Sequence, residues 1–296
     1  MQLFDSKHTS TLLENNIKEF VANNREILAS KVLKIIQIGE NASSQKYISL
    51  KKAFCERMGI ACSISIIDSH ESDETIKDYI SKLLDDPCIA GCIIQLPLPR
   101  PSLQNLLDLI PVPIDIDLLS TKSHHLFYNN DFSRLPPVVR GVDLFLKHHR
   151  ISPANLNVCI LGFGDLVGKP VSSFLSAKGS QVTVYDSKYY DKDPANNDVS
   201  RLMKHANILF KPNYVPGTSL DCNLVITSIG IPNLILSRDI VSGASVIDFG
   251  YAVVNSKAVG DISLEQDLSH LNFLSPSPGG MGPLIVRFLV MNFLGI

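Results

Sequence analysis

The stretch CILGFGDLVGKPVSSFL, residues 159 to 175, joins an apolar run typical of a strand to a glycine-rich turn and the start of a helix. Glycine permits tight turns, and the free amides at a helix N-terminus can bind a phosphate. The turn departs from the usual G-x-G-x-x-G pattern, because Gly162 and Gly164 fit it but Gly168 comes one residue late. This stretch therefore predicts an α/β unit that binds a dinucleotide.

An acidic residue follows where such a unit holds a ribose. The run QVTVYDS predicts the next strand, and Asp186 lies at its end, 24 residues after Gly162. A carboxylate at that place accepts hydrogen bonds from the ribose hydroxyls of adenosine. A glycine turn alone is weak evidence, and a purely structural turn is the alternative. The strand, turn, helix, second strand and acid together favour a dinucleotide site.

Strand-like and helix-like segments alternate along most of the chain. Residues 31–38, 61–68 and 89–95 predict strands, and residues 44–60 and 72–86 predict helices. Further strands are predicted at 157–162, 181–186, about 206–210, 223–227 and 244–248. This alternation predicts parallel sheets with helices on both faces.

A proline-rich interval, residues 99–119, separates two alternating regions. Residues 123–137 predict a loop and residues 140–151 a helix, so we place the domain boundary there. The final helix, LIVRFLVMNFLGI, is apolar enough to pack back on the first domain. We therefore expect one domain of residues 1–140 plus 282–296 and a second of residues 141–281.

The composition argues against several classes of function. The formal net charge is −2, without a basic excess, so binding to nucleic acid has little electrostatic support. No apolar run reaches the roughly 20 residues that span a bilayer, and the first residues lack the layout of a secretory signal. The six cysteines are scattered, which predicts buried free thiols, no metal site and a reducing cytoplasmic setting.

The ordered motifs of the chain resemble those of the bifunctional methylenetetrahydrofolate dehydrogenase/cyclohydrolase family (FolD type). The turn from Gly162 to Pro170 is similar to the family's G-R-S-x-x-V-G-x-P, with Phe163 in place of Arg and Gly164 in place of Ser. The segments GENASSQKYISLKK, IIQLPLP, IDIDLL and SPSPGGMGPLI are similar to four further motifs, and VIDFG and VGDI resemble D-V-G and G-D-V. Several motifs in family order are far more specific than any one of them.

The resemblance implies two α/β domains, an N-terminal catalytic, folate-binding domain and a C-terminal Rossmann-type NAD(P)-binding domain, with a cleft between them. It implies oxidation of 5,10-methylenetetrahydrofolate by NAD(P)⁺ and hydrolysis of the methenyl product to 10-formyltetrahydrofolate, in the one-carbon metabolism that serves purine biosynthesis. It also implies a homodimer that pairs through the nucleotide domain.

The resemblance assigns roles to four residues of the first domain. Lys51 would be the acid/base of the folate cleft and Gln95 would orient it. Tyr47 would stack on the folate ring system and Asp117 would bind the pterin edge. Taken separately, these residues could be a surface pair, an edge residue and a turn former, and only the ordered match favours catalysis. The further substrate contacts that we expect are Leu96, Pro97, Pro278, Gly279 and Gly280.

The expected cofactor site contains Gly162, Phe163, Gly164, Val167, Gly168, Asp186, Ser187 and Tyr251. In members that use NADP, the Arg of G-R-S helps to hold the 2′-phosphate, which Phe163 cannot do. Asp186 would repel that phosphate, although Ser187 and the nearby Lys188 could still favour it. On balance these residues predict a weak preference for NAD over NADP.

Departures from the family motifs leave other functions open. Ile114 and Leu118 replace the lysine and glycine of K-D-V-D-G, and Val138 and Val139 replace the Thr and Pro of P-C-T-P. Such changes would suit a monofunctional dehydrogenase or a catalytically silent paralogue that binds a nucleotide or folate, although the presence of Lys51 favours a retained cyclohydrolase. An unrelated amino-acid or shikimate dehydrogenase would not explain the QLPLP and PGGMGP segments together.

Overall fold

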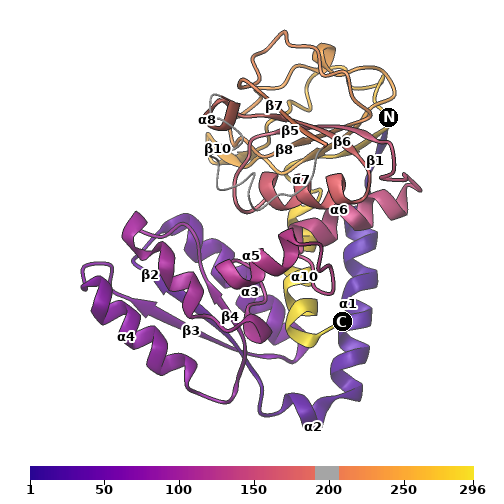
Figure 1. The fold of residues 1–296 in the computed structure, drawn as a ribbon. Helices are drawn as coiled ribbons and strands as arrows, with labels where there is room; N and C mark the ends of the chain where they lie inside the picture. The colour runs from indigo at the N-terminus through magenta and orange to yellow at the C-terminus, as the bar shows by residue number, and fades with distance from the viewer. Residues whose placement is uncertain (191–206) are drawn as a thin grey trace. The chain divides into compact units, whose positions relative to one another are not determined.

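The computed structural model describes residues 1–190 and 207–296, and the chain divides into two compact units (Figure 1). Unit 1 comprises Met1–Ser10 and Tyr128–Ile285, and unit 2 comprises Thr11–Phe127 and Val286–Ile296. Each unit is therefore made of two separate segments of the chain. The division into functional domains at residues 140 and 281 stays a prediction.

Unit 2 is built on a three-stranded parallel sheet in the order β3-β2-β4. The strands are β2 (Val32–Ile38), β3 (Ala61–Ile67) and β4 (Ile89–Ile94). Side chains of the central strand alternate between two hydrophobic clusters, with Leu33 and Ile35 in one and Ile36 and Ile38 in the other. This alternation gives the sheet a buried core on each face.

Helices cover both faces of this sheet. On the face of Leu33 lie α1 (Ser6–Asn23), α3 (Ala42–Met58) and the last helix, α10 (Gly282–Leu294). On the opposite face lie α4 (Asp73–Leu84) and the 3₁₀ helix η1 (Pro101–Leu109). α2 (Arg25–Leu28) follows α1, and η2 (Val112–Ile114) follows η1. The helices predicted at 44–60 and 72–86 correspond to α3 and α4.

Local signals in the sequence set the start of α4 and the end of α3. α4 starts at Ser72, whose hydroxyl accepts a hydrogen bond from the Thr75 amide at 3.0 Å. α3 ends before Gly59, which has a φ of +74°, and the Ile60 amide then donates to the Cys55 carbonyl at 2.9 Å. These contacts fix where α3 stops and turns into β3.

One segment differs from the sequence prediction. Residues 123–137 were expected to form a loop, but Thr121–Tyr128 is a helix, α5. The Ser120 hydroxyl accepts from the Ser123 amide at 3.3 Å, and Phe127 is buried. The loop prediction is wrong for this stretch because a cap and two buried aromatic residues, Phe127 and Tyr128, rather than a long apolar pattern, define the helix.

Unit 1 contains a seven-stranded parallel sheet in the order β1-β12-β9-β8-β5-β6-β7. In chain order its strands are β1 (Gln2–Leu3), β5 (Asn157–Leu161), β6 (Gln181–Tyr185), β7 (Ile208–Lys211), β8 (Leu224–Thr227), β9 (Ser245–Asp248) and β12 (Phe273–Ser275). The strands predicted between 157 and 248 correspond to β5 through β9. Residue 206, the predicted start of β7, lies outside the described residues.

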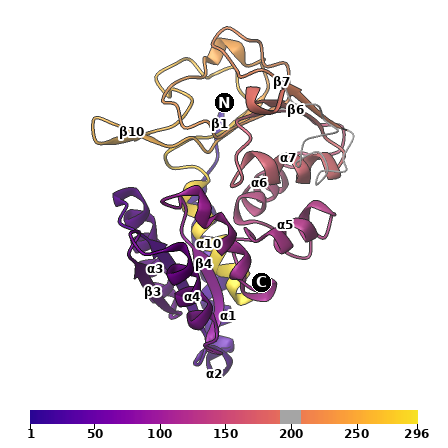
Figure 2. The same ribbon diagram turned by 60° about the vertical axis from the view of Figure 1, so that its left-hand side comes forward.

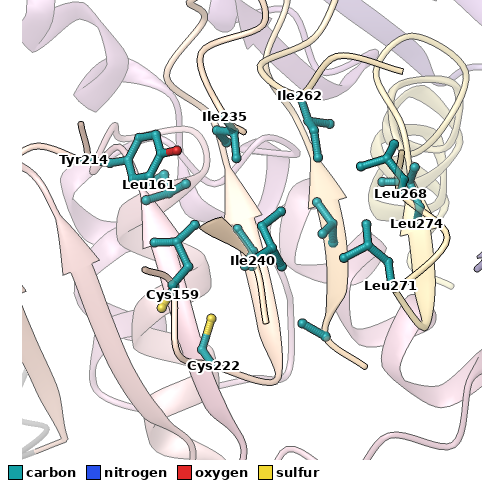
Figure 3. Close-up of a cluster of buried hydrophobic side chains, with 14 of the residues drawn as sticks. Cys159, Leu161, Tyr214, Cys222, Ile235, Ile240, Ile262, Leu268, Leu271 and Leu274 are labelled. Carbon is teal, nitrogen blue, oxygen red and sulfur yellow. The ribbon is translucent and has the colours of Figure 1, made fainter. Parts of the chain in front are cut away.

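One face of this sheet packs against helices and the other against loops. α7 (Gly168–Ala177) lies on β5 and β6, and α6 (Pro137–His148) lies on α7. The opposite face carries the cluster of Figure 3, in which Leu161 and Leu274 from strands meet Ile235, Ile262 and other residues from loops. The short elements of the unit are α8 (Ser187–Tyr190), η4 (Ser237–Asp239) and the hairpin of β10 (Ala252–Val254) and β11 (Lys257–Val259). No helix in the part of the chain that the structure describes is long and apolar enough to cross a membrane.

The strand order determines where unit 1 can bind a ligand. β5 lies between β6, which follows it in the chain, and β8, which comes later. At such a switch point the loops leave the sheet in opposite directions and open a crevice at the carboxyl ends of the strands. The two loops that flank this crevice are residues 162–167 and residues 228–230.

Candidate functional site

Lys51 and Gln95 contact each other in unit 2. Lys51 lies on α3, and its Nζ donates a hydrogen bond to Gln95 Oε1 at 2.9 Å. Gln95 directly follows β4, where its backbone amide donates to the Ile36 carbonyl at 2.8 Å. Its side-chain Nε2 donates to the Leu96 carbonyl at 2.7 Å, which leaves Oε1 facing the amine. The sheet thus fixes the acceptor that orients Lys51.

Asp117 lies in a segment that is tied to β4 and to α10. Asp115 forms a bridge with Cys92 of β4, and its carboxylate accepts from the amides of Leu119 at 3.2 Å and Ser120 at 2.9 Å. The intervening Ile116 is fully buried, and its carbonyl accepts from Asn292 Nδ2 at 2.9 Å. These contacts hold the backbone on either side of Asp117.

The charges of Lys51 and Asp117 act on each other. Burial lowers the pKa of the Lys51 amine, and the nearby Asp117 carboxylate opposes that shift. Burial likewise raises the pKa of Asp117, and the Lys51 charge opposes it. Desolvation disfavours the charged form of each group, while the opposite charge favours it. A lysine with a lowered pKa is better suited to exchange protons at neutral pH.

Three further residues predicted for the folate site, Tyr47, Leu96 and Pro97, lie close in the chain to Lys51 or Gln95. Tyr47 is one helical turn before Lys51 on α3, and 39% of its surface is exposed. Leu96 is half-buried, and its carbonyl also accepts from the Ser44 hydroxyl at 3.5 Å. Pro97 is exposed and follows a cis peptide bond. Unit 2 therefore brings Lys51, Gln95 and Asp117 together. Tyr47 lies one helical turn from Lys51, and Leu96 and Pro97 directly follow Gln95.

The glycine turn of unit 1 packs closely against the start of α7. Gly162 has a φ of +91°, and its amide donates to the Tyr185 carbonyl at 3.2 Å. A Cβ on Gly168 would lie 2.2 Å from the Gly162 carbonyl oxygen, so only glycine fits there. Among the described residues, a Cβ on Gly164 would have no neighbour within 4 Å, which leaves open space on their side of the turn. Val167 is the residue immediately before α7.

Asp186 joins the end of β6 to this turn. Its Oδ2 accepts from the Phe163 amide at 3.1 Å, and its Oδ1 accepts from the Lys188 amide at 2.9 Å. The Phe163 ring is buried and meets the Phe210 ring edge to face, with 5.1 Å between centroids. Ser187 donates its amide to Asn213 Oδ1 at 2.8 Å. The position that is Arg in the family motif is therefore part of the hydrophobic interior.

The loop after β12 contains the other predicted substrate contacts. The Gly280 amide donates to the Pro276 carbonyl at 2.7 Å, and Gly279 has a φ of +97°. A Cβ on Gly280 would lie 2.3 Å from the Pro276 carbonyl oxygen, so this turn requires glycine. The Ser6 hydroxyl donates to the Gly279 carbonyl. Pro278, Gly279 and Gly280 belong to unit 1, as does the half-buried Tyr251, whereas Lys51 belongs to unit 2.

Sequence reasoning assigned no role to two buried aspartates of unit 1, Asp248 and Asp261. Both lie in segments that were compared with family motifs, VIDFG and VGDI. The available signal was an acid close after an apolar run and within two residues of a glycine. Such an acid is seldom buried unless its carboxylate accepts hydrogen bonds.

Two family models match the chain. Residues 4–117 match the catalytic domain of tetrahydrofolate dehydrogenase/cyclohydrolase, and residues 136–296 match its NAD(P)-binding domain. The chain is 28% identical to the bifunctional protein FolD of Hydrogenobaculum sp., over 99% of this chain and 98% of that protein.

Solved structures give the same picture of the fold. The bifunctional FolD enzyme of Campylobacter jejuni is similar with a TM-score of 0.83 and 25% identity, over 99% of this chain and 97% of that chain. The Trypanosoma brucei enzyme, solved with NADP and an inhibitor, has a TM-score of 0.80 at 22% identity, with 99% and 96% coverage. The latter likeness concerns the fold alone.

Replacing Lys51 by methionine is expected to raise the pKa of Asp117 further, because the amine is the charge that opposes its burial. A carboxyl group whose pKa is higher in the folded than in the unfolded state favours folding at low pH, where it is protonated in both states. The free energy of unfolding then falls as the pH rises from the ordinary pKa of 3.8 through the folded-state pKa. In Lys51→Met this loss extends to higher pH. Urea unfolding at a series of pH values measures it.

Lys52→Met is the matched control, because Lys52 is the exposed neighbour on α3 and pairs with Glu56 on the surface. We expect its free energy of unfolding to follow the wild-type pH dependence. If Lys51→Met follows that same curve, Asp117 does not sense the amine.

Proposed function

The chain belongs to the tetrahydrofolate dehydrogenase/cyclohydrolase family, and on that basis we propose that it oxidises 5,10-methylenetetrahydrofolate with NAD(P)⁺ and hydrolyses the methenyl product to 10-formyltetrahydrofolate. The observation that carries the proposal is the hydrogen bond from Lys51 to Gln95, with Asp117 near the amine. This group lies in the segment that matches the family's catalytic domain.

The residues of unit 1 suit a dinucleotide. The turn from Gly162 to Gly168 leads into α7, whose N-terminal amides favour a pyrophosphate. The open space at Gly164 allows a ligand to approach the backbone, and Asp186 is placed to accept from ribose hydroxyls. When bound, the nicotinamide supplies the hydride acceptor, while the protein fixes the distance and angle of the reacting groups.

Lys51 is proposed as the acid/base of the hydrolysis. Water adds to the methenyl carbon and Lys51 takes one of its protons, which gives a neutral carbinolamine. The ammonium then returns that proton to the ring nitrogen, which keeps the electron pair of the breaking C–N bond. The carbinol hydroxyl loses its proton to solvent and becomes the formyl C=O. Burial lowers the pKa of the amine and so favours the neutral form that the first step requires. Gln95 keeps the amine aimed, and Asp117 accepts from the N–H groups of the pterin edge. Tyr47, Leu96 and Pro97 supply apolar contacts for the ring system.

Lys51→Met is expected to lose hydrolysis of methenyltetrahydrofolate by at least about a hundredfold, because no other group then carries the proton. Hydride transfer should remain within several-fold of wild type, since the nicotinamide performs that chemistry. Absorbance of the reduced cofactor and of the methenyl product measures the two steps separately. Lys52→Met should keep both activities. Binding of folate and cofactor by the wild type without turnover would instead support a silent paralogue.

We propose further that the cofactor preference is for NAD over NADP. Phe163 is buried against Phe210 and brings no cation to the turn. The Asp186 carboxylate is held by two backbone amides, at Phe163 and Lys188. It would repel a 2′-phosphate, but it can accept from a free 2′-hydroxyl. The exposed Lys188 offsets only part of that repulsion.

Asp186→Ser should lower the ratio of kcat/KM for NAD to kcat/KM for NADP by about tenfold, because it removes the charge that repels the phosphate. Initial rates with each cofactor give the ratio, in which any general disturbance of the turn cancels. Asp221→Ser, which removes an exposed carboxylate elsewhere in unit 1, should leave the ratio unchanged. A clear preference of the wild type for NADP would refute the proposal.

A homodimer that pairs through unit 1, acting in the cytoplasm, completes the proposed function. In the described part of the chain, β10 and β11 pair only with each other, and Figure 2 shows β10 away from the large sheet of unit 1. Val253 and Val254 of this hairpin are 60% and 42% exposed. Free strand edges with apolar side chains favour pairing with a second copy. The free thiol of the exposed Cys88 suits a reducing compartment.

Val253→Asp should convert the dimer to a monomer, because pairing would bring two charges into an apolar contact. Sedimentation velocity at micromolar concentration measures the assembly. Leu264→Asp changes another exposed apolar residue of unit 1, outside the hairpin, and should remain dimeric. A monomeric wild type under these conditions would exclude this interface.

A further inference from the structure

Two buried aspartates connect three loops of unit 1. Asp248 ends β9 and is 2% exposed, and Asp261 follows β11 and is fully buried. Within residues 1–190 and 207–296, neither carboxylate forms an ion pair. Buried carboxylates without a cation need several hydrogen-bond donors, so their partners show what they hold in place.

Asp261 holds the loop that follows β8. Its Oδ2 accepts from the Thr227 hydroxyl at 2.5 Å and from the Ile229 amide at 2.8 Å, and its Oδ1 accepts from the Gly230 amide at 2.8 Å. The same loop flanks the glycine turn, because the Ser228 amide donates to the Leu161 carbonyl at 2.9 Å. Asp261 therefore determines the shape of one wall of the switch-point crevice.

Asp248 holds the segments on both sides of the hairpin. Its Oδ1 accepts from the Gly250 amide at 2.7 Å, and its Oδ2 accepts from the Ile262 amide at 3.1 Å. A Cβ on Gly260 would lie 2.2 Å from Asp248 Oδ2 and 2.6 Å from the Ser277 carbonyl oxygen. Gly260 is thus packed between Asp248 and the first part of the loop after β12.

The two aspartates pack reciprocally. A Cβ on Gly250 would lie 2.2 Å from Oδ1 of Asp261, just as a Cβ on Gly260 would meet Asp248. Each carboxylate occupies the space that a side chain beside the other would need. A continuous set of contacts therefore runs from the glycine turn through the loop after β8 to Ser277.

We propose that Asp248 and Asp261 are positioning residues that hold the loop after β12, Pro276–Gly280, in place relative to the loop Ser228–Gly230, which flanks the glycine turn. The role rests on the proposed function, in which unit 1 binds the dinucleotide, and on the expectation from the sequence that Pro278, Gly279 and Gly280 contact the substrate. Neither aspartate contacts substrate in this scheme. They act through the backbone amides and glycines that they touch.

The positioning of the loop after β12 depends on the charge of Asp248. Burial, together with the neighbouring Asp261 carboxylate, raises the pKa of Asp248 to about 7, although the Ile262 and Gly250 amides oppose the shift. In the described residues Asp261 is the charged group that acts on it, while Thr227 of β8 and Ser275 and Ser277 in and after β12 are neutral. An ionised carboxylate accepts from both amides, whereas protonation places a donor against one of them. The loop after β12 is then held less firmly below neutral pH.

The test compares Asp248→Asn and Asp261→Asn with Asp239→Asn. Asp239 is also buried in unit 1, but it accepts from the Tyr214 hydroxyl and the Gly217 amide and touches none of these loops. The dehydrogenase kcat and KM are measured from about pH 5.5 to about 8.5. Amide hydrogen exchange of Gly250, Ile262 and Gly230 is followed over the same range, with intrinsic rates divided out.

In the wild type we expect kcat to rise through an inflection near pH 7, with exchange of Gly250 and Ile262 slowing as it rises. In Asp248→Asn, neither kcat nor the exchange of Gly250 and Ile262 should change with pH in this way. Its kcat at the high end of the pH range should be about tenfold below that of the wild type, with KM for the cofactor nearly unchanged. Asp261→Asn should move the inflection to lower pH, because it removes a like charge. Asp239→Asn can lose stability but should keep the wild-type profile.

An inflection that persists in Asp248→Asn, or one that Asp239→Asn also loses, would overturn the inference. The exchange measurement needs no turnover, so it tests the role of Asp248 independently of the proposed function. A wild type that turns over no folate would refute the proposed function, while exchange at Gly250 and Ile262 that ignores pH would refute the role of Asp248.

Discussion

Parallel pairing of strands imposes one constraint on which the candidate site depends, because every strand of a sheet must end at the same edge. In unit 2 this brings Gln95, which follows β4, to the edge that α3 overlies with Lys51. In unit 1 it gathers Gly162 and Asp186, which follow β5 and β6, and Asp248, which ends β9. Residues far apart in the chain therefore become neighbours without any local sequence signal for their contact.

The cost of burying charged groups is offset in different ways in the two units. Lys51 and Asp117 are an opposite pair, so each reduces the cost of burying the other. Asp248 and Asp261 are a like pair, and backbone amides rather than a cation offset their burial. The first arrangement leaves an amine able to exchange a proton, whereas the second couples a carboxylate to the position of loops. Both arrangements bury polar groups, whose removal from water costs stability.

The sequence allowed the regular elements and the central contact of the site to be predicted. Apolar runs bounded by turn residues identified β5, β6, β8 and β9 within about two residues. The ordered family motifs paired Lys51 with Gln95, which the structure joins by a hydrogen bond. Such features depend on local periodicity or on a pattern spread over the whole chain.

Other features depend on tertiary contacts that local patterns do not encode. β1 is two residues long and pairs with β12 from the other end of the chain, so no periodicity could reveal it. α5 owes its start to the Ser120 cap and its core contact to Phe127. The burial of Phe163 against Phe210, and the amide partners of Asp248 and Asp261, follow from the packing of distant segments.

The reciprocal packing of Gly250 and Gly260 with the two aspartates also limits how such sequences can diverge. A methyl group at either glycine collides with a carboxylate, and at Gly260 it also collides with the Ser277 carbonyl oxygen. At Gly250 the Asp261 carboxylate supplies the three nearest atoms, so this glycine and its opposing acid can be exchanged only together. A relative that has alanine at the position of Gly250 should therefore have a smaller residue at that of Asp261. Covariation between these two positions, rather than invariance of either one, is the evolutionary trace that this geometry would leave.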